Sequence, residues 1–168
     1  MISVNIAILI GVSLLVCLSI IAFVYKQTKY VKLSEVKQYV EANSEYLTEL
    51  ANQLMAEQKT EVEIYRHRSE LPPGCNIDKL YSDLKIANIF VAHNRPDIND
   101  PVSISFKEKK GNFICGIYYS PNDVIVSEGG TPKEGDKYEY NDEYNDRHIY
   151  RSEKICDYWY YYEDDTWN

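Results

Sequence analysis

Cysteine and histidine are the side chains in this sequence best suited to act as nucleophiles, bases or metal ligands. Apart from Cys17, they all lie beyond residue 60, at Cys75, Cys115, Cys156, His67, His93 and His148. Structural zinc sites usually contain ligand pairs only about two to four residues apart, and no such pair occurs here. A Cys–His nucleophile pair has no recognisable local motif either. We therefore predict no metal site, no cofactor and no catalytic residue.

Acidic pairs are the other candidate for chemistry. Asp142-Glu143 and Asp164-Asp165 lie in strongly charged stretches that are expected to be solvated. General acid and base catalysis needs two carboxyl groups whose environments separate their pKa values, which solvated pairs do not provide. The sequence also lacks a glycine-rich phosphate loop, a G-x-S-x-G elbow and an H-E-x-x-H zinc motif. These absences favour a protein that is not an enzyme.

The cysteines beyond the first segment raise the question of a disulfide. Three thiols allow three single bridges, and sequence alone does not choose among them. Cys115 and Cys156 both fall in expected strands, so they are the preferred pair if the domain lies in an oxidising compartment. In a reducing compartment all of them are expected to be small buried hydrophobic residues.

The first 25 residues contain no Asp, Glu, Lys or Arg. At ~1.5 Å per residue, a helix over residues 2–24 would cross the ~30 Å hydrocarbon core of a bilayer. A cleaved signal peptide would carry a positive charge before this run and small residues after it, whereas Phe23, Val24 and Tyr25 end it. We predict a transmembrane anchor over residues 1–25. Ala7 and Gly11 would let two such helices approach closely.

Signals for the membrane orientation conflict. Lys26, Lys29, Lys32 and Lys37 follow the run, and the positive-inside rule places such a cluster in the cytoplasm. The short tail before the run and an acidic domain with cysteines favour the outside of the cytoplasm instead. We expect a single-pass protein whose folded domain is extracytoplasmic.

No Gly or Pro interrupts the chain between Gly11 and Pro72, so a helical stalk is expected over residues 26–59. Seven of its residues recur at alternating spacings of three and four, the pattern of a coiled-coil seam: Leu33, Val36, Val40, Asn43, Leu47, Leu50 and Leu54. Asn43 would set the register of such a seam. The stripe either joins two copies in a homo-oligomer or packs on the chain's own sheet.

Residues 60–168 predict an α+β domain. Alternating residues favour an extended segment at Thr60–Ile64, a hairpin of Val102–Phe106 with Phe113–Tyr119, and a further strand at Asp123–Ser127. A short helix is expected within Ile77–Ile89. Weaker strand candidates follow at residues 138–140, 147–151 and 154–162. The predicted fold is a transmembrane helix that continues into a long amphipathic helix, then a small, mostly antiparallel sheet with one short extra helix.

The net charge of −8 is concentrated in the last 48 residues, which hold 5 basic and 13 acidic side chains. That charge disfavours nucleic acid as a partner. Ten of the 16 tyrosines lie between Tyr118 and Tyr162. Phenol rings mixed with carboxylates suit a basic protein or a glycan, so Tyr158, Tyr160 and Tyr162 are predicted to bind a partner. The alternative is a small sheet that uses tyrosine in its core.

Residues 25–30, Tyr-Lys-Gln-Thr-Lys-Tyr, and Ser34-Glu35-Val36 resemble the stretch just outside the membrane in the holins of T-even bacteriophages. The resemblance implies one spanning helix and a periplasmic α+β domain that senses an antiholin and lets the protein cluster into lethal membrane lesions. It covers roughly a dozen positions. The longer charged N-terminal tail of that family is missing here, and no functional residue is carried over.

These observations predict a membrane-anchored envelope protein that acts by self-association and by binding a partner through its folded domain. Holin-like lesion formation in host lysis is what the resemblance adds. Two alternatives stay open: a pilin-like structural subunit, and a membrane-tethered module that recognises a protein or glycan through its acidic, tyrosine-rich face.

Overall fold

The structure is a computed structural model of the chain, and it describes residues 32–56, 62–75, 77–92, 100–106, 113–126, 133–142 and 144–167. All of these belong to one compact unit, Val31–Asn168. The predicted anchor, with Ala7 and Gly11, lies outside the described residues. Among the helices that are described, none combines the length and the apolar character needed to cross a membrane.

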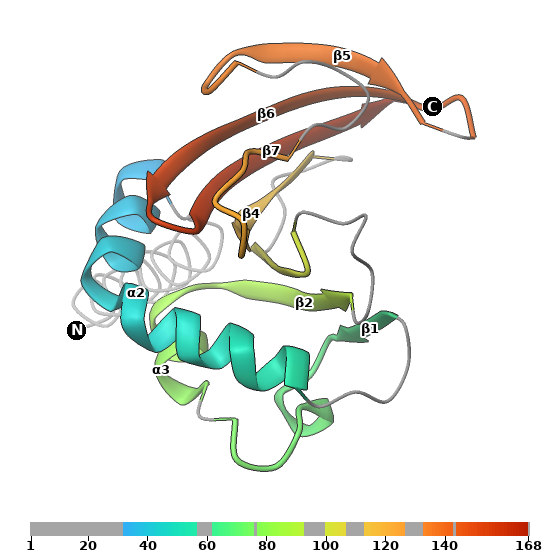
Figure 1. Cartoon of the computed structure of the whole chain (residues 1–168). Helices are drawn as coiled ribbons and strands as arrows, with labels where there is room; N and C mark the ends of the chain where they lie inside the picture. Colours follow the sequence, from blue (N-terminus) through green and yellow to red (C-terminus); the bar gives the residue numbers. More distant parts are fainter. Residues whose placement is uncertain are drawn as a thin grey trace, which may run out of the picture. The chain divides into compact units, whose positions relative to one another are not determined.

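The predicted α+β class is confirmed: one long helix precedes a seven-stranded antiparallel sheet (Figure 1). The helices are α2 (Leu33–Ala56), the short 3-10 helix η1 (Arg68–Glu70) and α3 (Asp78–Asp83). The strands are β1 (Val62–Tyr65), β2 (Ile86–Ala92), β3 (Val102–Phe106), β4 (Phe113–Tyr119), β5 (Lys137–Asn141), β6 (Arg147–Cys156) and β7 (Trp159–Trp167). Their order in the sheet is β1-β2-β3-β4-β7-β6-β5.

Helix α2 packs on one face of this sheet. Its buried side chains follow the predicted stripe: Val36, Val40, Leu47, Leu50, Ala51 and Leu54. They share a core with residues of β2, β3, β4 and β7, among them Ile104, Ile117 and Trp159. The Trp159 Nε1–H donates to Thr48 Oγ1 at 3.0 Å, and Lys37 Nζ lies 2.5 Å from Glu153 Oε1 on β6. Of the two alternatives for the stripe, the structure therefore supports packing within the chain, and α2 is not a free-standing stalk.

Asn43 differs from its predicted role in a coiled-coil register. Its backbone is non-helical, with φ −132° and ψ 20°, and its Nδ2 donates to the Tyr39 carbonyl at 2.7 Å. An asparagine side chain that bonds to a backbone carbonyl one turn earlier competes with the helical hydrogen bonds and produces a kink. The change of direction is visible in Figure 1, and it lets both halves of α2 stay on the sheet.

The predicted hairpin is confirmed as β3 and β4, with Ile104 opposite Ile117. The candidate strand at residues 154–162 is divided between the end of β6 and the start of β7 by a turn at Asp157 and Tyr158, where Tyr158 has a φ of 67°. The described part of the strand predicted at Asp123–Ser127 is a loop, because Asp123 has a φ of 53° and Ser120 Oγ accepts the Val124 N–H.

The helix predicted within Ile77–Ile89 is also shorter than expected. Helix α3 ends at Asp83, and the chain enters β2 at Ile86. Ile89 and Val91 are fully buried opposite Ile104 and Val102 of β3. Branched side chains favour a strand when a neighbouring strand is available, so tertiary pairing overrides the local helical spacing.

Gly116 in the middle of β4 allows a close approach across the sheet. The Tyr162 ring lies beside it, and the Tyr162 hydroxyl reaches Ser105 Oγ on β3 at 2.8 Å. A Cβ atom at Gly116 would lie 2.7 Å from Tyr162 Cε1 and closer still to the Ile104 carbonyl oxygen. An aromatic ring that covers a strand glycine in this way helps to set the register.

We expect Gly116→Ala to lower the free energy of unfolding by about 2 kcal/mol, since the methyl group overpacks a site bounded by backbone. Ser103→Ala, on the same face of the neighbouring strand, should change it by less than about 0.5 kcal/mol. Urea denaturation of the full chain in detergent, followed by tryptophan fluorescence, measures both. An unchanged midpoint for Gly116→Ala would contradict this account of the close approach.

Candidate functional site

The face of the sheet opposite α2 carries a continuous group of aromatic rings, here called the tyrosine face. Its members are Tyr118 of β4, Tyr160 and Tyr162 of β7, Tyr150 and His148 of β6, and Tyr138 and Tyr140 of β5. Tyr118 and Tyr160 stack with ring centroids 5.1 Å apart, and Tyr140 stacks on His148 at 4.7 Å. Strand alternation explains the grouping, because residues two apart on neighbouring strands share one face.

The inner part of the tyrosine face is a second small core. Tyr118 and Tyr160 are 1% and 4% exposed, and Val126 packs against both. The Tyr118 hydroxyl contacts Ser152 Oγ at 2.7 Å and accepts the Val126 N–H at 3.0 Å. The Tyr160 hydroxyl donates to Asp123 Oδ1 at 3.1 Å. These rings are therefore structural, as in the alternative that places tyrosine in the core.

Two of the predicted partner residues belong to this packed face. Tyr160 is buried, and Tyr162 is partly buried, with its ring beside Gly116 and its hydroxyl on Ser105. Burial raises the pKa of both Tyr160 and Tyr162 to about 12, so both phenols stay neutral near neutral pH.

Tyr158, the third predicted residue, is 43% exposed at the turn between β6 and β7. Its N–H donates to Asp123 Oδ1 at 2.9 Å, while Lys154 Nζ lies 2.6 Å from Asp123 Oδ2. The hydrogen bond from Lys154 is the main reason that the pKa of Asp123 lies below its usual value. Asp123 therefore fixes the turn that displays Tyr158.

A groove of about 760 Å³ separates this turn from the outer side of α2. It is lined by residues of α2 from Ser44 to Ala56 together with Asp157 and Tyr158. Among the described residues, Glu45, Glu49 and Asp157 supply its charged groups, and no lysine, arginine or histidine of this part of the chain lines it. We call this hollow the acidic groove. Carboxylates beside an exposed phenol ring suit a cationic segment of another protein.

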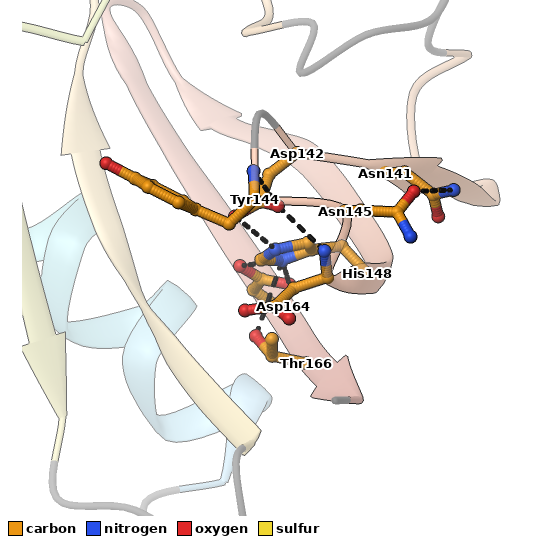
Figure 2. Close-up of polar contacts among 8 residues, drawn as sticks. Asn141, Asp142, Tyr144, Asn145, His148, Asp164 and Thr166 are labelled. Carbon is orange, nitrogen blue, oxygen red and sulfur yellow. Dashed lines mark hydrogen bonds and ion pairs between the residues drawn. The ribbon is translucent and has the colours of Figure 1, made fainter.

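At the outer end of the tyrosine face, His148 lies between two aspartates (Figure 2). Its Nδ1 is 2.9 and 3.1 Å from the two carboxylate oxygens of Asp164, and Thr166 Oγ1 is 3.3 Å away. Its Nε2 faces Asp142 Oδ2 at 3.6 Å. Burial of the ring lowers the pKa of His148, but Asp164 and Asp142 raise it by more, so the pKa lies above the usual 6.5.

The sequence predicts that Asp142 and Asp164 are solvated acids and does not indicate this cluster. In fact burial raises the pKa of Asp164, against the opposing effect of His148. The sequence signal for this cluster is the alternation of side chains along β6 and β7. It places His148 directly opposite Thr166 and next to Asp164. Within the described ranges, no three His, Cys, Asp or Glu residues are arranged to hold a metal ion.

The Cys115–Cys156 disulfide, predicted for an oxidising compartment, is not formed in this structure. Among the described residues, no disulfide joins Cys75, Cys115 and Cys156. Cys115 lies opposite Glu163 and Cys156 opposite Trp159, so β7 runs between them and they are offset by four residues along it. At ~3.3 Å per residue that offset alone is ~13 Å, far beyond the Cα separation of a disulfide.

No protein-family model matches this chain, and no curated protein or solved structure matches it significantly. The resemblance of residues 25–36 to the holins of T-even phages therefore stays a prediction that those residues alone support.

The two tyrosines of the β6–β7 hairpin should respond differently to truncation. We expect Tyr160→Ala to lower the free energy of unfolding by about 3 kcal/mol, because it leaves a cavity and removes one hydrogen bond to Asp123. Tyr158→Ala should cost less than about 1 kcal/mol, since its ring is exposed. Thermal and urea unfolding of both variants measures the difference. Equal losses of unfolding free energy in the two variants would contradict the assignment of Tyr160 as buried and Tyr158 as exposed.

Proposed function

We propose that this chain is a single-pass membrane protein of the cell envelope whose folded domain, outside the cytoplasm, binds a partner protein. The anchor is supported by the run of 25 residues without a charged side chain, which is long enough to span a bilayer. The domain that follows buries the stripe of α2 in its own core, so it needs no second copy to complete its fold.

The acidic groove is the observation that carries partner binding. It combines a hollow surface, an exposed ring on a turn fixed by Asp123, and carboxylates with no basic side chain beside them among the described lining residues. Acidic residues also repeat at Glu41, Glu45 and Glu49, one turn apart on α2. Like charges at this spacing cost an isolated helix about 0.2–0.5 kcal/mol per pair, so this stripe does not serve helix stability. A partner with lysine or arginine would offset that repulsion.

Self-association is the second candidate, and the resemblance at residues 25–36 extends it to holin-like lesions in host lysis. The apolar residues of the predicted coiled-coil seam pack against the chain's own sheet. We therefore place contact between copies at the spanning helices, where Ala7 and Gly11 would allow a close approach.

Fractionation tests the anchor. The full chain should sediment with membranes, resist extraction by alkaline carbonate and dissolve in detergent. Replacing Leu14 and Val16 with arginine should release it, since each charge at the centre of a span costs about 2.5–3.5 kcal/mol. Ser13→Ala serves as the control and should remain in the membrane. Recovery of the wild-type chain in the aqueous fraction would overturn the anchor.

Protease access tests the orientation. The domain should be degraded in spheroplasts and protected in intact cells, because the outer envelope shields it until it is opened. Protection that persists until the inner membrane is lysed would place the domain in the cytoplasm, as the Lys26 to Lys37 cluster predicts.

Photocrosslinking tests the groove. A crosslinking amino acid at Asn52 should yield a specific adduct, and Glu45→Gln with Glu49→Gln should reduce its amount about tenfold, because two charge contacts are lost. The same probe at Asp136, an exposed residue outside the groove, is the control. Equal adducts from both positions would contradict binding in the groove. Adducts between differently tagged copies of the chain would favour self-association there.

A further inference from the structure

Asp142 holds together the turn between β5 and β6. Its Oδ1 accepts the Tyr144 N–H at 2.9 Å and the Asp146 N–H at 2.8 Å. Two backbone hydrogen bonds close the same turn, from Asp142 N to the Asp146 carbonyl and from Asn145 N to the Asp142 carbonyl, both at 3.1 Å. Asn145 has a φ of 66°, a conformation that needs such support. The Asp142 carboxylate therefore accepts two of the four hydrogen bonds that close this turn, and its orientation determines whether those two are kept.

The other oxygen of Asp142 faces an unsatisfied atom. His148 Nδ1 is within hydrogen-bond distance of both Asp164 oxygens, and because an ionised carboxylate only accepts, the ring proton is on Nδ1. His148 Nε2 is buried without a hydrogen-bond partner, 3.6 Å from Asp142 Oδ2. In the neutral imidazole, the lone pair of Nε2 faces the Asp142 carboxylate oxygen, and the two acceptors repel each other. In an imidazolium the same nitrogen is a donor.

We propose that His148 and Asp142 form a proton-operated latch on the β5–β6 turn. A proton from solvent adds to Nε2, and the N–H then donates to Asp142 Oδ2 after a small closure of the 3.6 Å gap. That charge-assisted hydrogen bond orients the carboxylate whose other oxygen caps Tyr144 and Asp146. When Nε2 loses this proton, Nε2 and Asp142 Oδ2 are again two acceptors that repel each other, and the turn becomes less ordered.

The charged groups around His148 determine at which end of the pH range the latch is closed. In the described part of the chain, the titratable groups facing the ring are Tyr140 from β5, Asp142 from the turn and Asp164 from β7. Both acids favour the imidazolium, and no basic side chain of the described residues is among the groups that shift its pKa. A histidine whose pKa is raised on folding stabilises the fold below its unfolded pKa. That contribution disappears as the pH rises through the folded pKa.

The latch controls the display of one side chain in particular. Tyr144 is 77% exposed, and Figure 2 shows its ring extending away from the His148 cluster. Its backbone N–H is one of the two that Asp142 caps. An ordered turn therefore presents this ring in one orientation at acidic to neutral pH, and a loosened turn does not.

Hydrogen exchange of the full chain in detergent micelles tests the latch, read as protection factors of the Tyr144 and Asp146 amides relative to their intrinsic rates. Protection should fall about tenfold between pH 5.5 and pH 8.5, as expected for the loss of one charge-assisted hydrogen bond. Titration of the His148 ring by NMR should give a pKa above 6.5 that coincides with this fall.

Asp142→Asn gives the decisive comparison. Its amide oxygen keeps the two caps, while its amide nitrogen replaces Oδ2 and donates to the neutral His148 Nε2. The pH dependence should therefore reverse, with greater protection at pH 8.5 than at pH 5.5. His148→Gln should remove the dependence, and His67→Gln, which replaces an exposed histidine at the start of η1, should leave it as in the wild type.

Three results would overturn the latch. The first is protection of Tyr144 and Asp146 that does not depend on pH in the wild type. The second is an unchanged dependence in His148→Gln. The third is an Asp142→Asn variant with the wild-type direction of change. None of these results depends on the acidic groove or on the membrane anchor.

Discussion

The register of β7 between β4 and β6 is the constraint on which the other features depend. Along this strand, Trp159 and Tyr161 point into the core that α2 covers, whereas Tyr160, Tyr162 and Asp164 point to the opposite face. A shift by one residue would exchange these two sets. The ring over a glycine in β4 and the tight turn that precedes β7 both hold that register, so the core, the tyrosine face and the histidine cluster share one origin.

The packing of α2 has a direct consequence for interactions with other molecules. An amphipathic helix with an apolar stripe of this length could join two copies of a chain, but here the stripe is covered by the chain's own sheet. What remains outside is a polar, acidic side with a hollow along it. The proposed partner would therefore meet charged groups and a single exposed ring more than apolar area, and such a contact would be specific and sensitive to salt.

Tyrosine serves two purposes in this domain. Tyr118 and Tyr160 fill space that aliphatic residues would fill elsewhere, and their hydroxyl groups find partners in Ser152 and Asp123. Because buried phenols must be satisfied, they connect the sheet to the loop and turn beside it. Exposed tyrosines occur only at turns among the described residues, at Tyr144 and Tyr158. The abundance of tyrosine is therefore mainly a property of the packed interior, and Tyr144 and Tyr158 are the exceptions at the surface.

The sequence alone determined features that depend on local periodicity: the apolar stripe of α2, the β3–β4 hairpin, the acidic C-terminal part and the charge-free first 25 residues. Tertiary structure decided which partner each pattern meets. Part of the predicted helix is strand β2, and Tyr160 is buried in the sheet. Cys115 and Cys156 lie far apart, and His148 contacts two aspartates that the sequence predicts to be solvated. The physical reason is that spacing along the chain determines only which side chains share a face of a helix or strand. What that face packs against depends on strand order and register, which are set by burial over the whole sheet.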